Sequence, residues 1–189
     1  MPNWCENELV VTGPAEAVRR FREQARSTGR TLSFAAFVPE PDYDDPALAG
    51  RDWWPPAGSL LPGWYAWRLV HWGPKWDVNE SSVRVAEGDR RLVYGFATPY
   101  GPPLPWLTTV SAEFPELHFV IDYHELMLNF RGRQVFADGE WQDAQEGRYF
   151  DLCEWCGAEY ALPFPDQPRP DEPLWCGQCV EGHDLFEPD

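Results

Sequence analysis

Lysine is nearly absent from this chain, and long apolar runs are absent altogether. Lys75 is the only lysine among 15 basic residues. A transmembrane helix requires about 20 consecutive apolar residues, and no segment approaches that length. Residues 1–4 open the chain without the basic region and apolar stretch of a secretory signal. These absences argue against a membrane span, and we expect a cytoplasmic protein.

Recognised catalytic patterns are also missing. The sequence has no serine or cysteine nucleophile beside a base, no glycine-rich phosphate loop and no helical His-Glu pair. The sequence therefore favours a binding protein over an enzyme, without deciding between them.

Negative charge dominates the chain and is concentrated near its C-terminus. The formal net charge is −16, and residues 138–189 contain 14 acidic residues against two arginines. Such a field repels the phosphate backbone of nucleic acids, so nucleic-acid binding through this part is disfavoured. A basic protein partner fits the charge better, although an acidic surface can also serve solubility alone.

The hydrophobic pattern predicts alternating strands and helices in residues 1–137. Hydrophobic residues make up 43% of the 189 residues and aromatic residues 15%, enough for one core with a small appendage. The predicted elements are a strand at 4–12, a helix at 14–28, a hairpin at 83–98, a helix at 107–114, a strand at 117–123, and a hairpin at 126–137 that turns at 131–133. The order β-α-β-β-α-β, with an insertion at about 31–80, predicts a ferredoxin-like α+β fold. In this fold two helices cover one face of an antiparallel sheet.

Two Cys-x-x-Cys pairs stand near the C-terminus. Cys153 and Cys156 form the first pair, Cys176 and Cys179 the second, and 19 residues separate the pairs. Four thiolates from two tight turns match the tetrahedral coordination of structural zinc. Since four protein ligands leave no open position, we expect one structural zinc ion per chain, in a linker and zinc-ribbon module at residues 138–189. Disulfides or a redox dithiol are the alternatives, which a cytoplasmic location disfavours.

A tryptophan-rich segment surrounds the single lysine. From Trp72 to Asp77 the sequence is Trp-Gly-Pro-Lys-Trp-Asp, in which Lys75 could lie between two indoles, with Asp77 as its counter-ion, and bind an anionic group. Trp76 and Glu125, the latter at the end of a predicted strand, complete this candidate ligand site. The alternative is that the tryptophans belong to the core and that an ion pair between Lys75 and Asp77 fixes a loop.

Two smaller features complete the candidate sites. His118, Asp122 and His124 lie on one side of their strand and could bind a metal, but no further element is predicted to close such a site. Cys5, the unpaired fifth cysteine, is expected to be a buried thiol in the first strand.

Several short motifs follow one another along the chain. They are Pro2-Asn3-Trp4-Cys5-Glu6-Asn7, Leu32-Ser33-Phe34 with Pro39-Glu40-Pro41, the run from residue 67 into the Trp-Gly-Pro-Lys-Trp-Asp segment, Phe96-Ala97-Thr98 before Pro102-Pro103, and Tyr123-His124-Glu125. In this order they resemble the landmarks of the YubB-type ferredoxin-like family of bacterial plasmids, phages and related mobile elements. The resemblance spans residues 2–137 and implies the ferredoxin-like fold. Proteins of this kind generally carry no assigned activity, and the zinc module is an addition to their pattern.

The sequence thus predicts a zinc-containing binding or accessory protein that engages a protein partner through its tryptophan-rich or acidic surface. The alternative is an enzyme or binder that acts on a nucleotide or nucleic acid through the Trp-Gly-Pro-Lys-Trp-Asp segment, by analogy with mobile-element relatives. A third class, an acidic mimic of DNA, fits the net charge but not its concentration in a proline-rich tail.

Overall fold

A six-stranded antiparallel sheet covered on one face by helices organises the protein. The computed structural model describes residues 2–48, 50–55, 59–153 and 156–162. In these residues the principal elements are β1 (Trp4–Thr12), α1 (Ala15–Ala25), α2 (Gly63–His71), β2 (Arg84–Glu87), β3 (Arg91–Pro99), α3 (Leu104–Glu113), β4 (His118–Glu125), β5 (Phe130–Ala137), β6 (Glu140–Gly147), β7 (Phe150–Leu152) and β8 (Glu159–Ala161). Two short 3₁₀ turns, Pro46–Leu48 and Glu80–Ser82, lie in the connections.

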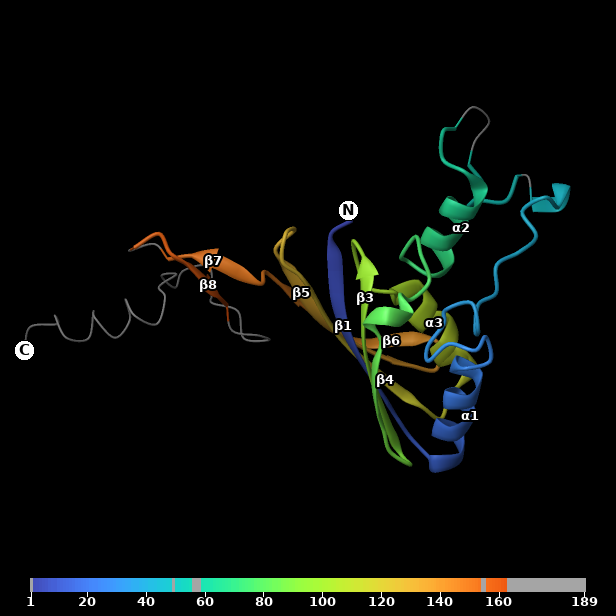
Figure 1. The fold of residues 1–189 in the computed structure, drawn as a ribbon, viewed down its shortest axis with the longest axis horizontal. Helices are drawn as coiled ribbons and strands as arrows, with labels where there is room; N and C mark the ends of the chain where they lie inside the picture. Colours follow the sequence, from blue (N-terminus) through green and yellow to red (C-terminus); the bar gives the residue numbers. More distant parts are fainter. Residues whose placement is uncertain (1, 49, 56–58, 154–155, 163–189) are drawn as a thin grey trace, which may run out of the picture.

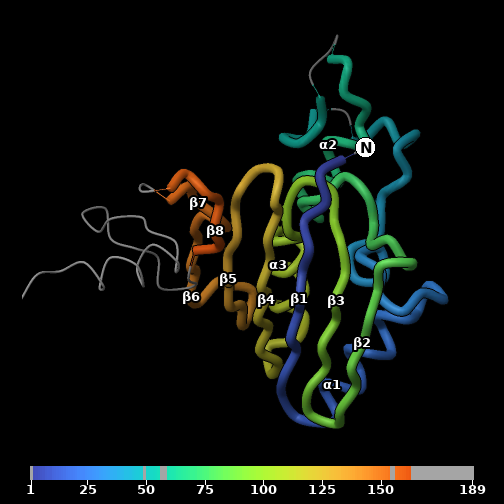
Figure 2. Tube along the Cα trace, turned by 60° about the vertical axis from the view of Figure 1, so that its left-hand side comes forward, coloured from blue at the N-terminus to red at the C-terminus, as the bar shows by residue number. Residues whose placement is uncertain are grey.

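The strand order is β2-β3-β1-β4-β5-β6, and every neighbouring pair is antiparallel. The first four strands with α1 and α3 have the expected β-α-β-β-α-β connectivity. Figures 1 and 2 show α1 and α3 on the same side of the sheet, while the opposite face of the central strands is left open. The ferredoxin-like α+β fold predicted from the sequence is therefore confirmed.

The period-two pattern of β1 separates the two faces of the sheet. Cys5, Leu9 and Val11 are fully buried beneath the helices, whereas Glu6 and Glu8 are exposed on the open face. Successive side chains of a strand point to opposite faces, so one strand contributes both to the core and to the outer surface.

Aromatic packing joins α1 to the sheet. The Phe21 ring, on the buried face of α1, stacks on Phe37 at 4.9 Å between ring centroids and meets Phe114 and Phe119 edge-on at 5.6 Å. Offset and edge-to-face arrangements are the favourable ones for aromatic pairs. The α1 helix is therefore held by specific ring contacts as well as by loss of apolar surface to water.

The insertion at residues 31–80 contributes to the core as well as to the surface. Leu32, Phe34 and Val78 are fully buried, and the indole Nε1 of Trp106 on α3 donates a hydrogen bond to the carbonyl of Phe34 at 3.2 Å. The helix expected in this segment is α2, whose Trp67 faces inward. None of the described helices is long and apolar enough to cross a membrane.

Two predictions about the end of the sheet require correction. Residues 131–133, expected to form a turn, lie inside the continuous strand β5, and the connection between β4 and β5 is made by residues 126–129. Residues 138–149 were expected to be a loose link, but Glu140–Gly147 form β6 and pair with β5 along its length.

The β7–β8 hairpin is attached to the sheet through the start of β5. Asn129 Oδ1 accepts hydrogen bonds from the amides of Tyr149 and Phe150 at 3.0 and 2.8 Å, and its Nδ2 donates to the Phe150 carbonyl at 2.9 Å. Arg131 donates to the carbonyl of Leu162, just after β8. The sheet and the hairpin are therefore linked by several hydrogen bonds.

Candidate functional site

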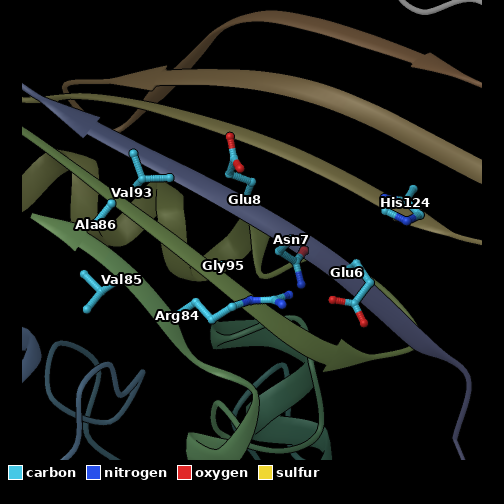
Figure 3. A pocket seen from close by; sticks show the side chains of 9 residues that line it. All are labelled: Glu6, Asn7, Glu8, Arg84, Val85, Ala86, Val93, Gly95 and His124. Atoms are coloured by element: carbon cyan, nitrogen blue, oxygen red, sulfur yellow. The ribbon is translucent and has the colours of Figure 1, made fainter.

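The open face of the sheet carries a groove, which we call the sheet-face groove. Its volume is about 650 Å³, and it is lined by Glu6, Asn7, Glu8, Arg84, Val85, Ala86, Val93, Gly95 and His124. Figure 3 shows these side chains arranged over β2, β3, β1 and β4. The groove is thus built from strands that are far apart in sequence.

Strand register explains why the face is hollow at this point. Glu8 on β1 lies opposite Gly95 on β3, and Gly95 lies opposite Arg84 on β2. A glycine between two long side chains leaves the floor low, and the stem of Arg84 extends across it (Figure 3). A Cβ atom placed on Gly95 would approach only Arg84, at 3.8 Å, so the space above this residue is open.

The carboxylates of the groove have no hydrogen-bonding partner within the described part of the protein. There, neither Glu6 nor Glu8 forms a hydrogen bond or an ion pair through its side chain. By contrast, the nearby Asp122 is bound by Arg133 through two contacts of 2.7 Å. Both carboxylates therefore remain able to form an ion pair with a ligand, in a groove that Arg84 lines and with Glu8 also in electrostatic range of Arg133.

The C-terminal hairpin flanks the groove on the β4 side. His124 pairs with Glu6 across the strands, and its ring stacks on Tyr149 with 4.9 Å between ring centroids. Tyr149 precedes β7, and Arg131 lies over the same ring at 5.6 Å. The side chain of His124 thus joins the groove to the base of the hairpin.

A second cluster of exposed rings surrounds the single lysine, and we call it the aromatic–lysine cluster. It consists of Trp4, Lys75, Trp76 and Tyr100. Lys75 Nζ lies 4.3 Å from the centroid of the Trp76 ring and 5.1 Å from that of Tyr100. The Trp4 and Trp76 rings are 6.2 Å apart. The predicted placement of Lys75 between two indoles is therefore corrected: the lysine lies between an indole and a phenol.

Asp77 is not the counter-ion of Lys75. Its carboxylate accepts hydrogen bonds from the Ser33 hydroxyl and the Phe34 amide, both at 2.6 Å, and pairs with Arg30 at 3.4 Å. The predicted ion pair between Lys75 and Asp77 is therefore wrong, and Asp77 contacts Arg30, Ser33 and Phe34 instead.

Trp72 and Glu125 also have structural roles. The Trp72 side chain is buried, and its Nε1 donates to the Val38 carbonyl at 2.9 Å. Glu125 is buried at the end of β4, where its carboxylate accepts hydrogen bonds from the amides of Met127 and Leu128. Of the predicted ligand residues, Lys75 and Trp76 are therefore the ones found in the aromatic–lysine cluster.

Cys5 is a buried thiol, as predicted. Burial raises the pKa of Cys5 to about 12, and the negative charges of Glu125 and Glu6 act in the same direction. Since the thiolate is the nucleophile in cysteine chemistry, this residue is not poised for catalysis.

The structure describes half of the predicted zinc site. Cys153 is buried and Cys156 is exposed at the turn between β7 and β8. Gly157 has φ 72°, and its amide donates to the Cys153 carbonyl at 2.8 Å. Cys176 and Cys179 lie outside the described residues. Within the described part of the chain no group of three or more potential ligands is found, and His118, Asp122 and His124 form no such group.

Several residues of the groove and of the aromatic–lysine cluster were not predicted from the sequence. The alternation in β1 is a signal that Glu6 and Glu8 share the outer face, but the pairing with Gly95 and Arg84 depends on strand order. Tyr100 gave no signal, because its position follows from an unusual turn after β3.

Together, fold and sites define a ferredoxin-like α+β protein with a polar groove on its open sheet face. Residues 72–155 match the family model described as "Ferredoxin-like domain in Api92-like protein". Among solved structures, the chain is similar to the crystal structure of a protein api92 from Yersinia pseudotuberculosis. The sequence identity is 12%, the TM-score is 0.46, and the similarity covers 79% of this chain and 98% of that one. No curated protein matches the chain.

Proposed function

We propose that this chain is a protein-binding module whose sheet-face groove receives basic side chains of a partner. The observation that carries this proposal is the pair of carboxylates of Glu6 and Glu8, which project from one strand into the groove without a hydrogen bond or ion pair among the described residues. Basic side chains would supply the missing ion pairs, and the net charge of −16 would steer such a partner toward the protein.

The composition of the open face supports a protein partner over a nucleic acid. The four-stranded RNA-binding sheets of RNA-recognition motifs stack bases on aromatic side chains of the sheet face. Here the corresponding central positions of β1 and β3 are occupied by Glu8 and Gly95. A carboxylate beside a glycine offers no stacking surface and repels phosphate.

The proposal is tested with a synthetic peptide that has arginine at alternate positions, titrated calorimetrically into the full-length protein. A twin peptide with glutamine in place of arginine serves as the neutral probe. We expect the double change Glu6→Gln and Glu8→Gln to weaken arginine-peptide binding about tenfold, since each partly exposed ion pair contributes up to about 1 kcal/mol. Changing two exposed acids elsewhere, Asp52→Asn and Asp89→Asn, should have little effect at the same net charge.

Two further variants make the test specific to the groove. Gly95→Val should fill the floor and abolish binding, whereas Gly101→Val, at a site where an added Cβ meets nothing within 4 Å, should not. Arg84→Met should strengthen binding of the arginine peptide, because it removes a like charge. Equal losses in the groove double variant and in the Asp52/Asp89 control would refute the proposal.

We further propose that the C-terminal part binds one structural zinc ion through Cys153, Cys156, Cys176 and Cys179. The described half of the site fits this role. Gly157, in the left-handed region directly after Cys156, lies between β7 and β8, and a glycine at this place is compatible with the tight turn that two ligands of one zinc ion would need. When bound, zinc would supply folding energy to this part, because its ligands come from two separate turns.

Elemental analysis of reduced, full-length protein tests the zinc proposal. We expect one zinc per chain, and loss of the metal from the Cys153→Ser variant. Absence of zinc from freshly prepared reduced protein would contradict it. A cytoplasmic location and membership among mobile-element proteins, both expected from the sequence, belong to this proposal and do not depend on the zinc result.

A further inference from the structure

We infer that the aromatic–lysine cluster is a second binding site, and that its ligand is a nucleotide. The cluster combines three partly exposed rings with one cation: Trp4 is 37% exposed, Trp76 39% and Tyr100 48%. The rings come from the start of β1, the loop after α2 and the turn after β3. This inference goes beyond the proposed function, because it concerns a different surface and a different class of ligand.

The backbone at Tyr100 is held in a costly conformation that presents its ring to Lys75. Tyr100 has φ 70°, a left-handed conformation that a bulky residue rarely adopts. Its amide donates to the Asn3 carbonyl at 2.8 Å, and the Thr98 hydroxyl donates to the Gly101 carbonyl at 2.7 Å. Strained conformations of this kind cluster at ligand sites. The two hydrogen bonds fix the turn and so fix the ring.

Lys75 carries an available positive charge. Its ammonium group lies over Trp76 and Tyr100, and within the described residues no carboxylate lies within ion-pair distance of it. Asp77, its neighbour in sequence, is bound to Ser33 and Arg30 instead. An anionic group can therefore approach Lys75 without first displacing an acidic side chain.

The chemistry of the cluster specifies a ligand with two parts. Exposed tryptophan and tyrosine rings stack on planar bases whatever their sequence, and a lysine ammonium binds phosphate as a point charge. A base joined to a phosphate satisfies both. A long nucleic-acid strand is disfavoured, since Glu6 and Glu8 follow Trp4 on the same face of β1 and would repel the continuing backbone.

Calorimetric titration of the full-length protein with adenosine monophosphate, adenosine and inorganic phosphate tests the inference. We expect the nucleotide to bind best, adenosine more weakly and phosphate not measurably. Lys75→Met should weaken nucleotide binding about tenfold or more, as expected for loss of a charged hydrogen bond, and should leave adenosine binding unchanged. Trp76→Leu should weaken binding of both the nucleotide and the nucleoside.

Tyr100→Asn provides a second variant that preserves the turn, because asparagine tolerates the left-handed conformation. It should reduce nucleotide and adenosine binding while the protein stays folded. Arg90→Met and Trp141→Leu, an exposed cation and an exposed ring elsewhere, should change neither. Unaltered nucleotide affinity in Lys75→Met, or tighter binding of an eight-residue oligothymidylate than of the mononucleotide, would overturn the inference. Neither outcome bears on whether the sheet-face groove binds a peptide.

Discussion

Replacement of Asp77 by alanine should destabilise the protein by about 3 kcal/mol. The change removes the acceptor for the Ser33 hydroxyl and the Phe34 amide, whose residues are 1% and 0% exposed. An unsatisfied buried donor costs about 1–3 kcal/mol. The partly exposed pair with Arg30 adds less than about 1 kcal/mol. The Asp77 side chain is 17% exposed, so water can replace some of the lost hydrogen bonds. The expected total of about 3 kcal/mol is therefore near the lower end of the summed costs.

Thermal and urea unfolding of the full-length protein measure this effect. For a chain of this size about 3 kcal/mol lowers the melting temperature by roughly 6–12 °C. Lys75→Met is the matched control in the same loop and should cost less than about 1 kcal/mol, because the lysine has no ion pair to lose among the described residues. Asp77→Asn should fall between them, since the amide retains one oxygen acceptor. A loss below about 1 kcal/mol for Asp77→Ala, or an equal loss for Lys75→Met, would refute the assignment of Asp77 to the loop.

Two further predictions concern titratable groups. Burial raises the pKa of Glu40, but hydrogen bonds from Arg68 and Tyr43 outweigh it and hold the pKa below its ordinary value. The ionised Glu40 carboxylate therefore stabilises the fold above its unfolded pKa, and this stabilisation is lost as the pH falls through the folded pKa. Urea unfolding should show a fall in the free energy of unfolding over roughly pH 5 to 3. This fall should be smaller in the Glu40→Gln variant. Cys5, with its raised pKa, should resist iodoacetamide at about pH 8 in the native protein and react after denaturation, as peptide mass mapping would show. Modification of native Cys5 would contradict its buried placement.

The repeat of apolar residues along the chain predicted most of the fold. The alternation in β1 and the apolar face of α1 were visible because a strand repeats every two residues and a helix about every 3.6. The order of those elements then restricted the topology to a ferredoxin-like sheet. These features depend on neighbours in sequence, and for that reason they could be predicted without knowledge of tertiary contacts.

The errors at β5 and β6 have a tertiary origin. Gly132 between two arginines has the local character of a turn, but the Tyr123 ring packs against it so closely that an added Cβ would overlap the ring. The glycine is therefore needed for packing within a strand. The β6 sequence, Glu-Trp-Gln-Asp-Ala-Gln-Glu-Gly, shows no apolar alternation because most of this edge strand is exposed. Its strand conformation is supported by hydrogen bonds with β5.

The candidate sites were only partly predictable for the same reason. Lys75 and Trp76 were identified from their segment, but their partner rings come from Trp4 and Tyr100, which are distant in sequence. The assignment of Asp77 to Lys75 followed from proximity along the chain. In the structure Asp77 lies beside Ser33 and Phe34 instead, and sequence periodicity contains no information about that choice.

The two proposed sites meet on β1, and this has an electrostatic consequence. Trp4 and Glu6 are two residues apart on one face, which corresponds to about 7 Å along a strand. The Debye length at physiological ionic strength is about 8 Å, so charges at the adjoining ends of the two sites are only partly screened from each other. A basic peptide in the groove would neutralise Glu6, the groove carboxylate closest to Trp4 along β1, and so reduce its repulsion of a phosphate. A nucleotide bound at Lys75 would in turn add negative charge near the peptide. Because coupling between binding sites is reciprocal, each ligand should favour the other by the same factor.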